Sequence, residues 1–304
     1  MLGIIKKALN IKTLACGVLA GLACVSCSEF VFEDREHCPA YVFIKAEPVI
    51  LPSTWSSLNI GTWEDGRRQE DRTVSVYELN SGFYVAVSKN TYFEASLLGG
   101  WPEDWHGEGC LLVPEGNECP EGVGAYFGIQ IDKEEIYNAP LALTSLYANV
   151  IFTVKGADAG YAFDIFVDGI VDGFLYPGTG LHYGPFHAKA RDVEYLRREV
   201  RIPRQVAFAG PTKTDGAETA DRDALDHLTA TVYVENAQTG AMGKYVTIPI
   251  GKTVKESPYD WGALSLEDIH VELRMFRESI ASVTVRIAGW EKVIIGDNNG
   301  SYHI

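Results

Sequence analysis

Residues 73–98 read TVSVYELNSGFYVAVSKNTYFEASLL, and this stretch decides the fold class. Apolar and polar residues alternate along three short segments, 73–79, 83–87 and 92–98. An alternation with a period of two is typical of β-strands that bury one face. The triplets NSG and SKN separate the segments, and such tight connections suit antiparallel neighbours. The stretch therefore predicts an antiparallel meander.

The same strand-like composition recurs along most of the remaining chain. Turn-forming residues separate these segments, and no long stretch with a helical period interrupts them. The stretch SLED at 265–268 resembles a helix capping box, although the following IHVELRMF could equally form a strand. The further predicted strands are 41–46, 124–131, 148–155, 161–167, 193–202, 228–235, 244–250, 281–288 and 291–295.

Glycine, proline and aromatic residues concentrate in residues 176–192, which indicates a crossing between two domains. Asp168-Gly169 and Asp172-Gly173 are predicted turns, because glycine adopts positive φ without steric cost. Short alternating strands with many turns and few helices are typical of β-sandwiches. The sequence therefore predicts an all-β protein with two tandem antiparallel β-sandwich domains, residues 39–190 and 191–304.

Residues 1–26 have the pattern of a removable lipoprotein signal peptide. Three lysines lead an apolar run that is shorter than the roughly 20 residues needed to span a bilayer. Cys27 follows Val-Ser and precedes a polar Ser-Glu, so we expect its thiol to carry the lipid. Cys24 is the alternative site, and ordinary secretion without lipid is the alternative to both. Residues 27–38 would then form a short acidic tether.

The formal net charge of −15 at pH 7 limits the partners of the chain. Nucleic acid and anionic lipid both attract clustered lysine and arginine, so we expect neither to bind this acidic chain. Attachment to a membrane must then be covalent. The sequence contains no GxSxG, HExxH or P-loop pattern. We therefore expect no enzymatic activity and no cofactor. His106, His182 and His187 suit ordinary loop histidines, so we also expect no metal.

The cysteines outside the signal peptide leave two interpretations open. If Cys27 is acylated, an odd number of thiols remains, so at least one is unpaired within a monomer. Cys110 and Cys119 flank the loop LLVPEGNE and are the candidate disulfide. Two free thiols are the alternative. The spacing does not resemble a zinc site, which needs four closely grouped ligands.

Four tryptophans form a candidate aromatic binding surface: Trp55, Trp63, Trp101 and Trp105. Exposed indole rings suit the faces of sugars or a partner protein. In a β-sandwich, however, such rings more often pack in the core or against loops. If two or more are exposed together, the chain is better interpreted as a surface glycan-binding lipoprotein, which is the alternative function.

Several segments carry a family resemblance when they are taken in order with Cys27 and the acidic run after it. They are EDREHCPAYVFIKA at 33–46, ELNSGFYVAVSKNTYFEASLLGGW at 78–101, YANVIFTVKG at 147–156, DIFVDGIVDG at 164–173 and SVTVRIAGWEKV at 282–293. Together they resemble the FimB/Mfa family of Bacteroidales fimbrial anchor and accessory lipoproteins, within the fimbrillin superfamily. The resemblance covers most of the mature chain.

The resemblance implies two transthyretin-like β-sandwich domains, a lipid anchor in the outer membrane and a non-enzymatic role at the cell surface. Members of the family lie at the base of a fimbria or among its minor components, and they join other fimbrial subunits by strand addition. Main-chain hydrogen bonds to an open sheet edge suit such a joint. Because residues 28–37 are short and acidic, unlike a β-prone segment that is cleaved and exchanged, we expect an anchoring subunit.

Overall fold

A computed structural model gives the structure of the chain. The predicted signal peptide and tether, with Cys24 and Cys27, lie outside the described residues. Among the residues it describes, no helix is long and apolar enough to cross a membrane. The structure describes residues 39–46, 51, 55–133, 135–156, 162–176, 178, 180–207, 224–235, 239–276, 279–287 and 289–295.

Two sheets that share one hydrophobic cluster form the half of the molecule in which the described chain begins. Their strands are β1 (Ala40–Ala46), β2 (Ser57–Glu64), β3 (Arg67–Ser75), β4 (Phe83–Val87), β5 (Thr91–Gly99), β8 (Val123–Ile131), β9 (Ile136–Leu141) and β10 (Thr144–Ser145). Sheet A has the order β4-β1-β9, and sheet B has the order β10-β8-β5-β2-β3. Every second residue of β1, including Val42 and Ile44, is buried against side chains of sheet B such as Leu97.

A second pair of sheets encloses the other hydrophobic cluster. Sheet C contains β6 (His106–Gly107), β7 (Cys110–Leu112), β12 (Phe163–Leu175), β13 (Leu181–Lys189), β16 (Thr229–Glu235) and β17 (Met242–Ile248). Sheet D contains β14 (Arg191–Glu194), β15 (Arg197–Pro203), β11 (Tyr147–Lys155), β18 (Ile269–Phe276), β19 (Ser279–Ile287) and β20 (Trp290–Ile295), in that order. Alternation again selects the buried side chains, such as Ile165 of β12 and Val271 of β18.

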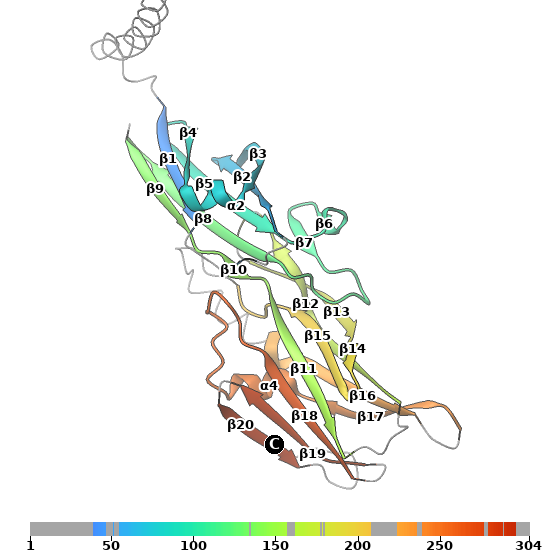
Figure 1. Cartoon of the computed structure of the whole chain (residues 1–304). Helices are drawn as coiled ribbons and strands as arrows, with labels where there is room; N and C mark the ends of the chain where they lie inside the picture. The colour runs from blue at the N-terminus through green and yellow to red at the C-terminus, as the bar shows by residue number, and fades with distance from the viewer. Residues whose placement is uncertain are drawn as a thin grey trace, which may run out of the picture.

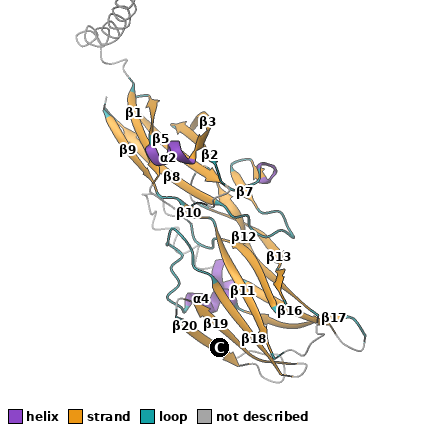
Figure 2. Ribbon diagram, viewed as in Figure 1, coloured by secondary structure: helices purple, strands orange, loops and turns teal. Residues whose placement is uncertain are grey.

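The two pairs of sheets lie end to end, so the molecule is elongated (Figure 1). The chain enters the first pair at β1, at one end, and the last described strand, β20, lies in the other pair at the far end (Figure 1). Strands account for almost all regular structure, and helices such as α4 (Ile250–Lys255) are short (Figure 2). The predicted all-β fold class is confirmed.

The predicted meander at residues 73–98 is wrong. Its first segment divides between β3 and the helix α2 (Val76–Ser81), whose N-cap Ser75 accepts a hydrogen bond from the Glu78 amide at 3.1 Å. β4 then pairs with β1 in sheet A, while β3 and β5 both pair with β2 in sheet B. The chain therefore changes sheet at each connection. Consecutive strands bury their apolar faces against the same hydrophobic cluster, but from opposite sides of it.

The prediction of purely antiparallel sheets also needs correction. β1 pairs in parallel with β9, and β11 pairs in parallel with β18. These partners come from distant parts of the sequence, so no tight connection joins them. The strand at 269–276, which the capping box left open, is β18 and lies in the middle of sheet D.

The sequence predicted a domain boundary at residue 190, but the strand pairing does not divide the chain there. β11 pairs with β15, and β12 pairs with β16, so strands on both sides of residue 190 share sheets. The chain instead first enters the second pair of sheets at β6 and β7, returns to the first pair at β8, and crosses again between β10 and β11.

The predicted turns at Asp168-Gly169 and Asp172-Gly173 are likewise wrong. Both pairs lie inside β12, where the register with β13 shifts. Gly173 is required there for close approach, since a Cβ atom would lie 1.9 Å from the carbonyl oxygen of Leu111.

Candidate interaction surfaces

The four tryptophans do not form an exposed surface. Trp63 and Trp101 are buried, at 5% and 7% exposed, and their rings pack edge-on against Tyr176 and Phe174. Trp55 and Trp105 are half-buried against the two hydrophobic clusters. The predicted aromatic binding surface is therefore wrong as a set, because the hydrophobic gain of burying an indole exceeds what loop exposure offers.

Trp105 lines a pocket of about 330 Å³. The pocket lies between the β6–β7 hairpin and the β12–β13 hairpin, with Asp104, Glu115 and Asp172 among its lining residues. Apolar walls with a few polar groups are typical of small-ligand sites.

Cys110 and Cys119 are both free thiols, so the predicted disulfide is not formed. Cys110 is half-buried in β7, whereas Cys119 is buried in the cluster between sheets C and D, with its Sγ atom 3.9 Å from the carbonyl oxygen of Leu146. Burial raises the pKa of the Cys119 thiol well above its usual value. A protonated, buried thiol behaves as a small apolar side chain.

His182 and His187 lie in β13 rather than in a loop. Each donates from Nδ1 to a carboxylate of β12, at 2.6 Å from Asp172 and 2.6 Å from Asp168 respectively. His106 lies exposed in β6. Among the described residues, no three His, Cys, Asp or Glu side chains come together in a group that could hold a metal ion.

A buried arginine joins the two pairs of sheets. Arg204, directly after β15, is 0% exposed and donates from Nη1 to the carbonyl oxygen of Ser145, at 2.9 Å. Its Nη2 donates to the carbonyl oxygens of Trp261 and of Ala263. Burial lowers the Arg204 pKa to about 10, so the guanidinium keeps its charge at neutral pH. Ser145 belongs to sheet B and the other acceptors precede β18, so one side chain fastens both halves.

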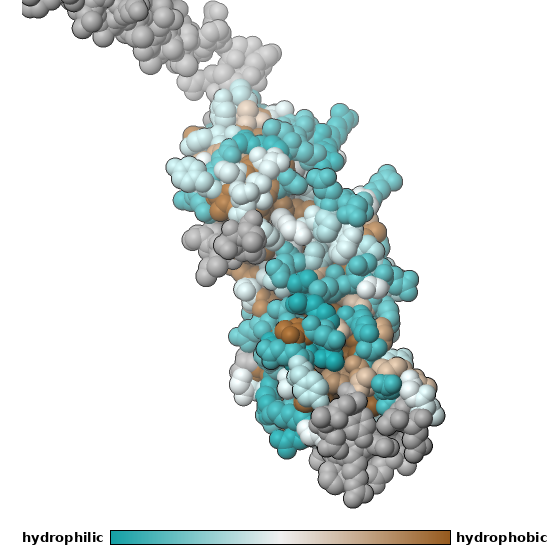
Figure 3. Space-filling view, turned by 45° about the vertical axis from the view of Figure 1, so that its right-hand side comes forward, coloured by the Kyte–Doolittle hydropathy of each residue, from teal (hydrophilic) through white to brown (hydrophobic). Residues whose placement is uncertain are grey.

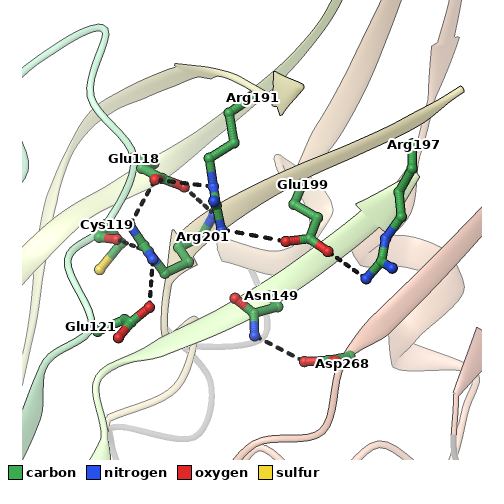
Figure 4. A network of polar contacts seen from close by, with 9 residues as sticks. All are labelled: Glu118, Cys119, Glu121, Asn149, Arg191, Arg197, Glu199, Arg201 and Asp268. Atoms are coloured by element: carbon green, nitrogen blue, oxygen red, sulfur yellow. Dashed lines mark hydrogen bonds and ion pairs between the residues drawn. The ribbon is translucent and has the colours of Figure 1, made fainter. Parts of the chain in front are cut away.

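A network of charged side chains fastens the same region from the surface (Figure 4). Arg201 of β15 bonds Glu118 at 2.6 Å and Glu121 at 2.7 Å, and its Nε donates to the carbonyl oxygen of Cys119 at 2.9 Å. The network continues along the sheet through Arg191, Glu199 and Arg197. It holds the segment before β8 against sheet D, where several charges acting together outweigh an isolated surface pair.

β3 is the free edge of sheet B, and charged side chains line it. Its sequence is RRQEDRTVS, and almost all of its side chains are exposed. Arg68 and Asp71 form an ion pair on the strand itself, at 2.5 Å. The register with β2 also shifts between Thr62 and Trp63. Charges and bulges on an edge prevent another chain from adding a strand.

The free edge of sheet D, β20, has a different composition. Its sequence is WEKVII, and Val293 is 50% exposed. β20 pairs with β19 on one side, and among the described residues no strand pairs with its other side. Two of the other edges suit strand addition less well, since β9 carries Pro140 and β14 has four residues, all exposed.

A ladder of charges fixes β20 to the rest of sheet D. Glu272 of β18, which is 5% exposed, accepts from Lys155 of β11 at 2.6 Å and from Arg286 of β19 at 3.0 Å. Arg286 also bonds Glu291 of β20, at 2.7 Å. The hydrogen bond from Lys155, followed by those from Arg274 and Arg286, lowers the pKa of Glu272 below its usual 4.5. The ladder therefore holds the edge strand in place across four strands.

Small and separate apolar patches appear on the face of the molecule in Figure 3, where hydrophilic side chains cover most of the middle. A large apolar interface is therefore not visible on that face. Sheet edges, which bind through the main chain, fit this surface better.

Comparison with known proteins supports the fold independently. No family model matches the chain, and no curated protein matches it. A candidate polysaccharide-binding protein from Bacteroides thetaiotaomicron has a TM-score of 0.56 at 9% identity, with 87% of this chain and 100% of that chain covered. The fimbrial anchor protein Mfa2 from Porphyromonas gingivalis has a TM-score of 0.54 at 10% identity, covering 84% and 99%.

A candidate adhesin from Bacteroides ovatus is similar to the same degree, with a TM-score of 0.53 at 8% identity, covering 85% of this chain and 96% of that chain. The chain shares its fold with these proteins. One of these neighbours is a fimbrial anchor protein, so the shared fold agrees with the fold that the FimB/Mfa resemblance implied.

Proposed function

We propose that the chain is a FimB/Mfa-type lipoprotein, held by lipid on Cys27 in the outer membrane at the cell surface, where it serves as an anchor or minor accessory subunit of a fimbria. The observation that carries this proposal is the open edge of β20, at the end of the molecule opposite the entry of the chain at β1. An anchored subunit needs its membrane attachment and its joint at opposite ends.

Strand addition is the joint that this geometry supports. A strand from another fimbrial subunit would continue sheet D beyond β20 through main-chain hydrogen bonds, with Val293 offering an apolar contact. The likeness in fold to a fimbrial anchor supports the same role. No catalytic step is required of the protein.

A basal subunit must also transmit force along its length. The buried Arg204 and the network around Arg201 tie the two pairs of sheets where the chain crosses between them. Hydrogen bonds to a charged group contribute about 1.5–3 kcal/mol each, so the three bonds of the buried Arg204 resist separation of the halves.

Isolation of intact fimbriae from producing cells tests the proposal. Mass spectrometry should find this chain in the basal or whole-fimbria fraction, and its absence from both would overturn the role. Metabolic labelling with a fatty-acid analogue should mark the wild-type chain, while Cys27→Ala should lose the label. Persistent labelling of Cys27→Ala would move the lipid to Cys24.

A second candidate function, glycan binding, is favoured by the pocket at Trp105. One structural neighbour is described as a candidate polysaccharide-binding protein, and an indole beside carboxylates suits a sugar ring. A glycan array probed with the wild-type protein and with Trp105→Ala tests it. Binding that Trp105→Ala abolishes supports the function, and no binding to any glycan removes it.

A further inference from the structure

The outward face of sheet A is unusually poor in charge. Its exposed side chains include Tyr41 at 44%, Tyr84 at 57% and Ile136 at 58%. The register aligns Tyr41 with both Ala86 and Ile136, so residues of all three strands share this face. Phe43 lies on β1, the central strand of this face, and its ring centroid is 4.8 Å from that of Tyr84.

The remaining positions of this face continue the pattern. Register pairs Phe43 with Asn138 and Lys45 with Pro140, so Lys45 is the charged group in these three described strands that faces outward here. Sheet D offers the contrast, since its outward side carries the ladder from Lys155 through Glu272 to Arg286. A solvated sheet face is normally polar, so an apolar and aromatic face marks a contact surface.

We propose that the surface of the lipid bilayer covers this face of sheet A, an inference that rests on the proposed lipid anchor. Sheet A lies at the end where the chain enters (Figure 1). Cys27 and Ala40 are separated by residues 28–39, which reach about 40 Å when fully extended. The lipid on Cys27 therefore keeps β1 near the membrane.

The composition of the face suits the boundary between headgroups and acyl chains. Tyrosine places an apolar ring in the hydrocarbon edge and a hydroxyl among the headgroups, and such rings are enriched at membrane interfaces. The acidic chain is not attracted to anionic lipid, so the contact depends on apolar burial. A tethered face needs only weak affinity, because the anchor makes the contact intramolecular.

Depth-dependent quenching of a probe on the full lipidated protein tests the contact. Tyr84→Cys places an NBD probe on the face, and Tyr195→Cys places the matched probe on the β14–β15 turn, where Tyr195 is 69% exposed. Both variants carry Cys38→Ser and Cys110→Ser to prevent labelling elsewhere. The protein is reconstituted in phosphatidylethanolamine and phosphatidylglycerol vesicles that contain doxyl-labelled lipid.

The probe at position 84 should be quenched at least twofold more than the probe at position 195. Equal quenching at the two positions would overturn the inference. Should Tyr84→Cys fail to fold, Ile136→Cys supplies a second position on the same face. A further control is the same probe at position 84 on protein in detergent without lipid. If the probe becomes shielded from water as the protein concentration rises, a second copy of the chain covers this face, and this result also overturns the inference.

Flotation of the same vesicles separates this inference from the proposed function. Wild-type protein should float with the vesicles and Cys27→Ala should not. A wild-type protein that fails to float contradicts the anchor itself. If it floats while position 84 remains unquenched, the anchor stands and the membrane contact of sheet A fails.

Discussion

β3 and β20 are both free edges, but only one of them is built to remain free. β3 carries charges along RRQEDR and a shifted register with β2, whereas β20 reads WEKVII. Exposed strand edges invite pairing with other chains, and proteins block this with charge and irregularity. The difference indicates that β3 is protected against pairing, while β20 keeps an edge that another subunit can extend.

The largest effect is expected when the β20 edge is given the protection that β3 has. Val293→Lys should reduce recovery of the chain in isolated fimbriae at least tenfold, because a lysine on an edge strand opposes the addition of another strand. The matched control is Gln69→Lys on β3, which should leave recovery unchanged. Normal incorporation of Val293→Lys, measured by quantitative mass spectrometry, would contradict the role of β20.

The next effect tests whether Arg204 holds together the two pairs of sheets that carry these edges. Arg204→Met should lower the free energy of unfolding by about 3 kcal/mol, since three carbonyl oxygens, buried or partly buried, lose their donor. Arg191→Met, which changes a half-exposed ion pair, should cost about 0.5 kcal/mol or less. Urea unfolding followed by tryptophan fluorescence measures both, and equal stabilities would show that Arg204 does not hold the halves together.

The charge ladder predicts a pH dependence specific to the β20 side. The depressed pKa of Glu272 means that its stabilisation is present above pH 4.5 and is lost as pH falls below that value. Glu272→Gln should therefore be about 1–2 kcal/mol less stable than wild type at pH 7. The difference should shrink at lower pH, where the wild-type carboxyl is protonated.

Thermal unfolding of wild type and Glu272→Gln across pH 3–7 checks this prediction. Since Lys155, Arg274 and Arg286 are about half exposed or more, water already screens part of their interaction with Glu272. A difference in stability that stays constant over the whole range would contradict a charged role for Glu272.

The smallest effect concerns the protection of β3. The double substitution Arg68→Thr with Asp71→Thr removes an exposed ion pair and should change stability by about 0.5 kcal/mol or less. It should nevertheless allow weak self-association through the exposed edge, visible by analytical ultracentrifugation at high protein concentration. A variant as monomeric as wild type would mean that the bulge alone protects β3.

Much of the secondary structure could be predicted from local pattern, but partner strands could not. β4 was predicted to the residue, and β1 and β5 to within one residue at each end, because alternation reports which face is buried. Pairing of β1 with β9 depends on segments far apart in sequence. The helix α2 had a visible signal, since Ser75 and Glu78 have the spacing of a capping box.

The candidate site shows the same limit. Nothing in the sequence distinguishes the buried Trp63 from the half-buried Trp105, because burial depends on tertiary packing. Arg204 bonds main-chain carbonyls, which have no sequence signature, so its role was not predicted. The contrast in charge between β3 and β20 was readable from the sequence, yet it has meaning only once both are known to be edges.

Hydrogen exchange in the assembled fimbria tests the central claim most directly. The main-chain amides of Trp290–Ile295 should exchange more slowly in the fimbria than in the isolated chain, because an added strand accepts their free hydrogen bonds. The amides of Arg67–Ser75 should exchange equally in both states. Unchanged exchange in β20, or new protection in β3, would contradict the assignment of β20 as the joint.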